Sequence, residues 1–217
     1  MSPKVLYEDN HIVAVYKPAG VLTQPDKSRE EDLMTAVKKY LKEKYKKSGN
    51  VFLGLLHRLD RPVSGIVLFA KTSKGASRVS EQFRNGAIEK IYHAVVEGKF
   101  PKEKGKLVNY LGKDKKKKKA VEGKGKKAEL SCEVIKSNDK YSLLKIRPHT
   151  GKFHQIRAQL SLAGFPIVGD IKYGAKFPLI DRSIALCESS IAFKLATKNE
   201  MKKISILLPV DWSQYMR

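Results

Sequence analysis

The sequence has 217 residues, and its 44 lysines and arginines outnumber its 22 aspartates and glutamates, for a formal net charge of +22. A hydrophobic content of 41% is typical of a globular protein and argues against a disordered or fibrous one. No stretch approaches the roughly 20 apolar residues of a membrane-spanning helix, and segment 1–4 lacks the apolar run of a secretory signal. We therefore expect a cytoplasmic protein whose charge favours a polyanionic partner, above all a nucleic acid.

Strand and helix patterns alternate over the first half of the chain. Short β-prone runs predict strands at 5–7, 12–15, 66–70 and 90–97. The first two flank the turn-like segment 8–11 and should form a hairpin. Helical spacing of apolar residues predicts helices at 31–47 and 74–84, the second capped by Thr72 or Ser73.

The second half is richer in strands. The same patterns predict strands at 128–135, 141–146, 185–195 and 203–208, and a helix at 154–163. The first two of these strands should form another hairpin. Because strands dominate and helices are interspersed, the predicted fold class is α+β with a mixed, mainly antiparallel central sheet. Cys132 and Cys187 lie in apolar-alternating surroundings and are expected to be buried thiols, although they could pair.

Segment 113–127 contains nine lysines and almost no apolar residue. Such a segment buries too little to offset its own ordering, so we expect a flexible loop between strands. A solvated loop without a role and a specific contact with a polyanion are equally compatible with this composition.

The first segment that could carry catalytic chemistry is His57-Arg58-Leu59-Asp60-Arg61. It leads through Ser64-Gly65 into the predicted strand 66–70, which is apolar enough to be buried. An aspartate between two arginines should stay ionised, because nearby positive charge lowers the pKa of a carboxylate. Such a group suits nucleophilic attack or proton abstraction better than proton donation. From the residues alone, a salt bridge in a loop is an equally good interpretation.

Two further segments combine basic and aromatic residues. Lys90-x-Tyr92-x-Ala94 lies on a predicted strand, where a tyrosine usually serves core packing. Segment 147–157 places basic and imidazole side chains beside a glycine turn where a helix begins. Because helix N-termini bind anions, this segment suits a phosphate or carboxylate.

His149 and His154 have no nearby Cys, Asp or Glu to complete a zinc site, so we expect no metal. We also find no phosphate-binding loop and no dinucleotide fingerprint, and therefore expect no cofactor.

Together and in this order, these segments resemble the motifs of the RluA/RsuA-type RNA pseudouridine synthases. His57-Arg58-Leu59-Asp60 is similar to the catalytic motif of the RluA branch, and Lys90-x-Tyr92-x-Ala94-x-Val96-x-Gly98 to the second motif. The third is matched by Thr150-Gly151-Lys152-x-His154-Gln155-Ile156-Arg157. The likeness spans residues 5–212. It departs from the pattern at Val63, Gln159 and Cys187-Glu188, where Thr, His and His-Ala are usual. These departures bear on substrate details more than on activity.

The resemblance implies one pseudouridine synthase catalytic domain over 1–217, with a catalytic cleft and without the N-terminal S4 RNA-binding domain of some members. It implies an isomerase that needs no cofactor, acts as a monomer and converts specific uridines of rRNA or tRNA to pseudouridine. Asp60 would be the essential carboxylate, Arg157 would pair with it, and Tyr92 would stack on the base and help remove the C5 proton. The base must be flipped out of its stem, and Arg58 would fill the space it leaves. The further residues that the resemblance assigns to RNA binding are His57, Arg61, Lys71, Lys90, Lys152, His154, Gln155 and Ile156.

Two other functions compete with this one. A non-catalytic RNA-binding protein could keep the fold, but it would have no need of Asp60, Tyr92 and Arg157 together. A hydrolase acting on a phosphorylated or nucleoside substrate would need a water-activating metal or a second acid, and the sequence offers neither.

Overall fold

The computed structural model describes residues 1–101 and 103–217, which form two compact units. The first unit comprises Met1–Glu89 and Ser190–Ile206, and the second comprises Lys90–Ser189 and Leu207–Arg217. Strand β10 (Leu186–Lys194) contributes residues to both units. No helix within the described ranges is long and apolar enough to cross a membrane.

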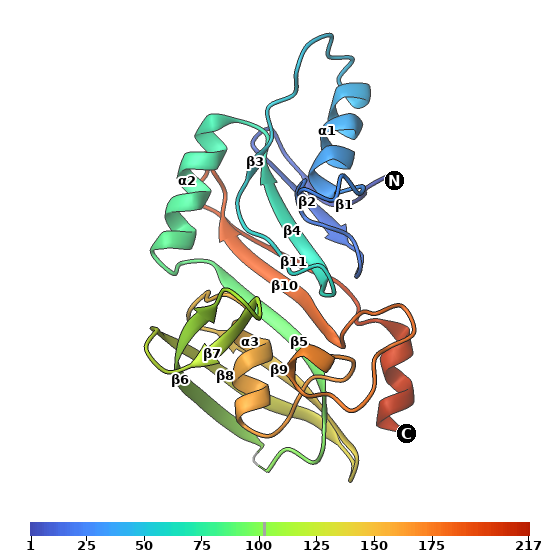
Figure 1. Cartoon of the computed structure of the whole chain (residues 1–217). Helices are drawn as coiled ribbons and strands as arrows, with labels where there is room; N and C mark the ends of the chain where they lie inside the picture. The colour runs from blue at the N-terminus through green and yellow to red at the C-terminus, as the bar shows by residue number, and fades with distance from the viewer. Residues whose placement is uncertain (102) are drawn as a thin grey trace. The chain divides into compact units, whose positions relative to one another are not determined.

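The first unit is an antiparallel sheet flanked by two helices (Figure 1). Its other elements are β1 (Lys4–Glu8), β2 (Ile12–Lys17), α1 (Leu33–Lys44), β3 (Gly54–Leu55), β4 (Ser64–Ala70), α2 (Ser73–Arg84) and β11 (Met201–Ser205). Strand β2 pairs with β1 and β4, and β3 also pairs with β4. All seven residues of β4 are buried, because both faces of the sheet are covered there. The predicted hairpin, buried strand and helices of this unit are confirmed.

Alternation along the strands builds the core of the first unit. Ile12, Ile66 and Leu68 point to the same face, where they pack with Val79 of α2. The side chain of Thr72 accepts a hydrogen bond from the backbone N–H of Gly75 (3.1 Å), which confirms one of the two predicted caps of α2.

The second unit is an antiparallel sheet in the order β5-β9-β8-β6-β7. Its elements are β5 (Glu89–Glu97), β6 (Lys104–Asp114), β7 (Lys119–Glu122), β8 (Lys126–Ser137), β9 (Tyr141–Pro148), α3 (Gln155–Leu162) and the 3-10 helices η1 (Ile171–Tyr173) and η2 (Val210–Met216). Helix α3 packs on one face, where Ala158 meets Ala128 and Leu111 in a small core. The α+β class and the mainly antiparallel sheet are confirmed.

The lysine-rich segment 113–127 forms strand where we expected a loop. The end of β6 pairs with β7 from Leu111↔Glu122 to Asp114↔Lys119, so the segment is mostly a β-hairpin. The backbone N–H of Ala120 donates to the Tyr173 hydroxyl (2.7 Å), and Lys119 lies over the Tyr173 ring, 4.6 Å from its centroid. The loop assignment was wrong because it considered side-chain composition alone, whereas backbone pairing and an anchor on Tyr173 supply the order.

Cys132 and Cys187 are buried thiols that form no disulfide, as predicted.

Candidate active site

Asp60 lies in the loop between β3 and β4, and hydrogen bonds fix the backbone on both sides of it. The Thr23 hydroxyl donates to the carbonyl of Leu59 (2.9 Å) and accepts the N–H of the same residue (3.3 Å). The Asp60 carbonyl accepts the N–H of Val63 (3.0 Å), and the Arg61 carbonyl accepts that of Gly20 (2.8 Å). The partly buried carboxylate of Asp60 therefore stands on a backbone with little freedom to move.

Lys17 is a second support of this loop and was missed as a site residue. Its side chain is buried, and Nζ donates to the carbonyls of Pro18 (2.9 Å), Val21 (2.8 Å) and Arg61 (3.1 Å). Burial lowers the pKa of Lys17 to about 7, although the negative charge of Asp60 acts in the opposite direction. The segment after β2 is thereby tied to the residue that follows Asp60. In the sequence, Lys17-Pro18 marks the end of a predicted strand and belongs to a segment, Tyr16-Lys17-Pro18-Ala19-Gly20, that resembles the opening motif of the same family, but neither signal gives Lys17 a role.

The basic residues around Asp60 differ in placement. Arg58 is exposed, whereas the partly buried His57 accepts the N–H of Leu68 at Nε2 (3.1 Å) and packs 5.1 Å from the ring of Phe83, centroid to centroid. Arg61 donates from Nε to the carbonyl of Gly20 (2.9 Å) and forms an ion pair with Glu30. Arg58 and Arg61 are thus both exposed, and Arg61 is engaged by Gly20 and Glu30.

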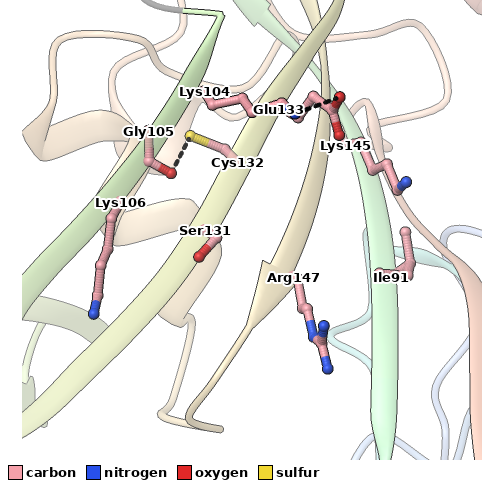
Figure 2. Close-up of a pocket in the computed structure, with 9 residues that line it drawn as sticks. All are labelled: Ile91, Lys104, Gly105, Lys106, Ser131, Cys132, Glu133, Lys145 and Arg147. Carbon is pink, nitrogen blue, oxygen red and sulfur yellow. Dashed lines mark hydrogen bonds and ion pairs between the residues drawn. The ribbon is translucent and has the colours of Figure 1, made fainter.

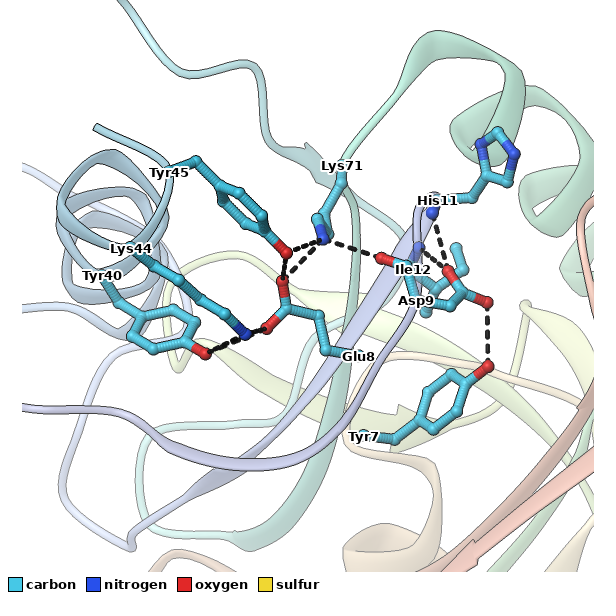
Figure 3. Close-up of polar contacts among 9 residues, drawn as sticks. All are labelled: Tyr7, Glu8, Asp9, His11, Ile12, Tyr40, Lys44, Tyr45 and Lys71. Atoms are coloured by element: carbon cyan, nitrogen blue, oxygen red, sulfur yellow. Dashed lines mark hydrogen bonds and ion pairs between the residues drawn. The ribbon is translucent and has the colours of Figure 1, made fainter. Parts of the chain in front are cut away.

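Lys71 belongs to a network around Glu8 (Figure 3). Its ammonium donates to Glu8 (2.6 Å), the Asp9 carbonyl (2.7 Å) and the Tyr45 hydroxyl (3.1 Å). Burial alone would raise the pKa of Glu8, but hydrogen bonds from Lys44, Lys71, Tyr45 and Tyr40 outweigh it and lower the pKa to about 2. Three bonds engage all three donors of Lys71, so this geometry favours a structural role over the RNA contact that the resemblance implied.

Tyr92 lies on β5 in the second unit. Its hydroxyl donates a hydrogen bond to Oε2 of Glu188, a residue of β10 that is fully buried. Burial raises the pKa of Glu188 to about 7, while the positive charge of Lys90 and the bond from Tyr92 act in the opposite direction. Sequence reasoning noted Glu188 only as a departure from the family pattern. Nothing in the sequence places it beside a residue 96 positions away.

Arg157 projects from α3 and holds a buried carboxylate. Its Nε and Nη2 donate to the two oxygens of Asp170 at 2.7 and 2.8 Å, and the guanidinium carbon lies 4.9 Å from the centroid of the Tyr173 ring. Both partners of this bidentate pair are almost fully buried. The predicted pairing of Arg157 with Asp60 stays a prediction, and Asp170 is the partner within its own unit that sequence reasoning missed.

The residues before Arg157 build the start of α3. His154 has a left-handed backbone (φ 50°), and its Nδ1 lies 2.9 Å from the Tyr173 hydroxyl. The Gln155 side-chain oxygen accepts from the Thr150 hydroxyl (2.7 Å) and from the backbone N–H of Lys152 (2.9 Å). His154 and Gln155 thus shape this turn. Ile156 is buried, whereas the Lys152 side chain is partly exposed and open to a ligand.

A pocket of about 540 Å³ lies on the sheet of the second unit and was not expected (Figure 2). Lys106, Ser131 and Arg147 follow one another across β6, β8 and β9 in register, and Lys104, Glu133 and Lys145 form the neighbouring row. Ile91 also lines the pocket, whereas its neighbour Tyr92 points to the opposite face of β5 by strand alternation. The sequence signal for this pocket is the spacing of its cations: Lys104 and Lys106 on β6, and Lys145 and Arg147 on β9, are two residues apart and so share a face of the sheet.

The two histidines considered for zinc have separate partners: His149 Nε2 lies 2.7 Å from the Ser131 hydroxyl, and His154 bonds Tyr173. Among the described residues, no group of three or more His, Cys, Asp or Glu is arranged to hold a metal ion.

The residues that the motifs single out lie in both units: Asp60 is in the first unit, and Tyr92 and Arg157 are in the second. The family model for RNA pseudouridylate synthase matches residues 11–162, and the chain belongs to this family. It is 32% identical over 176 residues to ribosomal large subunit pseudouridine synthase D of Borreliella burgdorferi, covering 78% of this chain and 54% of that one. It is 34% identical over 188 residues to tRNA pseudouridine synthase C of Vibrio cholerae, covering 79% and 74%.

Among solved structures, Human RNA Pseudouridylate Synthase Domain Containing 4 shares the fold. Its TM-score is 0.80 at 21% identity, with 98% of this chain and 91% of that chain covered. This chain thus spans about half the length of the Borreliella relative but nearly the whole of a solved member of the same fold.

Proposed function

We propose that this chain is an RNA pseudouridine synthase that isomerises specific uridines in structured RNA, with Asp60 as its essential carboxylate. The observation that carries the proposal is the family match over residues 11–162, which includes Asp60, Tyr92 and Arg157 together. The braced backbone around Asp60 supports it, because a catalytic group gains from being held in position before the substrate arrives. Both units would together form one catalytic domain.

The proposed chemistry needs one carboxylate and no cofactor. Uracil is detached from its ribose, turned and rejoined through C5, while Asp60 attacks or deprotonates the target nucleotide. By the resemblance of its motif, Arg157 would pair with the Asp60 carboxylate in addition to Asp170, since a guanidinium has several donors. Tyr92 would stack on the uracil and take part in removing the proton from C5. A base inside a stem must first be extruded, at a cost of a few kcal/mol, and Arg58 would fill the vacated space.

We propose rRNA or tRNA as the substrate, because both occur among the names of the relatives. Phosphate contacts would supply most of the affinity without reading the sequence. Lys90 and Lys152 would make such contacts beside the target. The cationic pocket of β6, β8 and β9 would bind phosphates farther along the RNA.

The proposal is tested with total RNA labelled with [5-³H]uridine in cells that lack this protein. Pseudouridine formation releases the hydrogen of C5, so the purified protein should liberate tritium from this RNA. Pseudouridine mapping of the same RNA should then show a few discrete new sites. If tritium release stays at the level without protein, and no site appears, the proposal is wrong.

A further inference from the structure

Glu188 is a buried acid placed directly against the candidate tyrosine. Its exposed surface is 0%, and its Oε2 accepts the hydroxyl hydrogen of Tyr92 across neighbouring strands. An ionised carboxylate is costly to bury unless charged or hydrogen-bonding partners compensate. Such a residue next to a reactive phenol therefore requires an explanation, either in stability or in chemistry.

Two groups of β5 act on the Glu188 carboxyl from the same unit. Tyr92 donates its hydrogen bond, and Lys90 supplies a positive charge. The Lys90 ammonium reaches toward the turn before α3: a Cβ added to Gly151 would lie 3.9 Å from its Nζ. Burial nevertheless prevails and raises the pKa of Glu188 to about 7. The carboxyl can therefore change its protonation state near neutral pH, where a proton acceptor is most useful.

The proposed reaction contains a step that a tyrosine alone performs poorly. After C5 has bonded to the ribose, it carries both its hydrogen and the new bond, and the hydrogen must leave. A phenol with an ordinary pKa of about 10 is almost wholly protonated at neutral pH and has no free base to offer. It can accept the C5 proton if its own proton leaves at the same time.

We propose that Glu188 is a positioning residue for Tyr92 that orients the phenol and takes its proton when the C5 proton is removed. The inference rests on the proposed function. In the step, the C5–H bond breaks and its proton passes to the Tyr92 oxygen, while the tyrosine O–H proton passes to Glu188 Oε2. The electron pair of the C5–H bond forms the C5=C6 double bond, the pair of the C6=N1 double bond moves onto N1, and N1 takes a proton from solvent. Glu188 then returns its proton to solvent, so the reaction remains an isomerisation.

A purely structural role for Glu188 makes different predictions. A buried hydrogen bond that only stabilises the fold would be replaced well by Glu188→Gln, since the amide oxygen also accepts from Tyr92. It would leave the pH dependence of the reaction unchanged. A proton-accepting role is lost with the amide, because a neutral amide is too weak a base.

The test compares wild type, Glu188→Gln and Glu188→Ala by single-turnover tritium release from [5-³H]uridine-labelled total RNA between about pH 6 and about pH 8.5. Glu43→Gln, the same substitution on the exposed surface of α1, is the control. We expect the wild-type rate to rise with pH through about 7 and the Glu188→Gln rate to fall by about 100-fold, a typical contribution of one proton-transfer group. The rise near pH 7 should be absent in the variant, and RNA binding should change by less than about twofold.

A rate and pH profile of Glu188→Gln equal to those of wild type and Glu43→Gln would overturn the inference and leave the proposed function standing. No tritium release by wild type would instead overturn the proposed function. If a variant folds poorly, the pH profile of wild type still tests the inference. A wild-type rate that does not change between about pH 6 and about pH 8 contradicts a role for the ionised Glu188.

Discussion

Arg157 and Asp170 form a bidentate ion pair whose side chains are only 6% and 1% exposed. A buried charge is stabilised by its oppositely charged partner, because water no longer solvates it. Removing one partner therefore leaves the other charge buried and uncompensated. Asp170→Asn should therefore lower the free energy of unfolding by about 3–5 kcal/mol, and Arg157→Lys, which loses the two-bond geometry, should also destabilise. Urea unfolding measures both. Exposed Lys39→Ala on α1 is the control and should change little. If Asp170→Asn lowers the free energy of unfolding no more than the control does, the buried ion pair does not stabilise the fold.

Lys17 should matter for the candidate loop as well as for stability. Lys17→Met keeps the length of the side chain but leaves the carbonyls of Pro18, Val21 and Arg61 without their shared donor. The Arg61 carbonyl keeps the N–H of Gly20, whereas the carbonyls of Pro18 and Val21 lose the bond from Lys17. A carbonyl left without a donor costs about 1–3 kcal/mol when it is shielded from water, so we expect a clear loss of stability. We also expect tritium release to fall by more than about tenfold at a temperature where the variant is folded, because a small displacement of Asp60 slows catalysis. Unchanged turnover in a folded variant would show that Lys17 does not position the loop.

The network around Glu8 predicts acid sensitivity. The pKa of Glu8 is about 2 in the folded protein against an ordinary value of 4.5, so its ionised form stabilises the fold. This contribution is present above about pH 4.5 and is lost as the pH falls from there toward about 2. Wild type should lose thermal stability over this range more steeply than Glu8→Gln. Parallel pH dependence of the two melting temperatures would contradict the network.

The cationic pocket predicts salt-sensitive RNA binding. Lys145→Ala and Arg147→Ala should each weaken binding to the labelled RNA and reduce the slope of log affinity against log salt by about 1, as for the loss of one phosphate contact. Lys39→Ala on the exposed surface of α1 serves as the matched control. Slopes that match the control would exclude the pocket from RNA binding.

Local patterns predicted much of the fold. The burial of 66–70 and the cap at Thr72 followed from apolar runs and from the hydrogen-bonding capacity of a threonine side chain. Strands β6 and β7 lie in or beside the lysine-rich segment and escaped prediction because lysine has low strand propensity. Pairing with β8 holds β6 in place, and pairing with β6 holds β7. Such pairing joins distant residues, and no local pattern reports it.

The candidate site was only partly predictable for the same reason. The motifs led to Asp60, Tyr92 and Arg157 as proposed site residues, whereas the contacts of Lys17, Asp170 and Glu188 with the Asp60 loop and these side chains come from the fold. Burial changes the pKa of two of these residues: it lowers the pKa of Lys17 and raises the pKa of Glu188, in both cases to about 7. Neither effect can be read from residue order, since both depend on how much water the fold excludes.

Asp60→Asn isolates the chemical role proposed for Asp60, because the amide keeps the size of the side chain and removes the carboxylate. The variant and wild type are added separately to total RNA from cells that lack the protein, and pseudouridines are mapped while RNA binding is measured in parallel. We expect discrete new pseudouridines with wild type and none with Asp60→Asn, at nearly equal RNA affinity. Pseudouridine formation by Asp60→Asn at the wild-type sites would contradict this role.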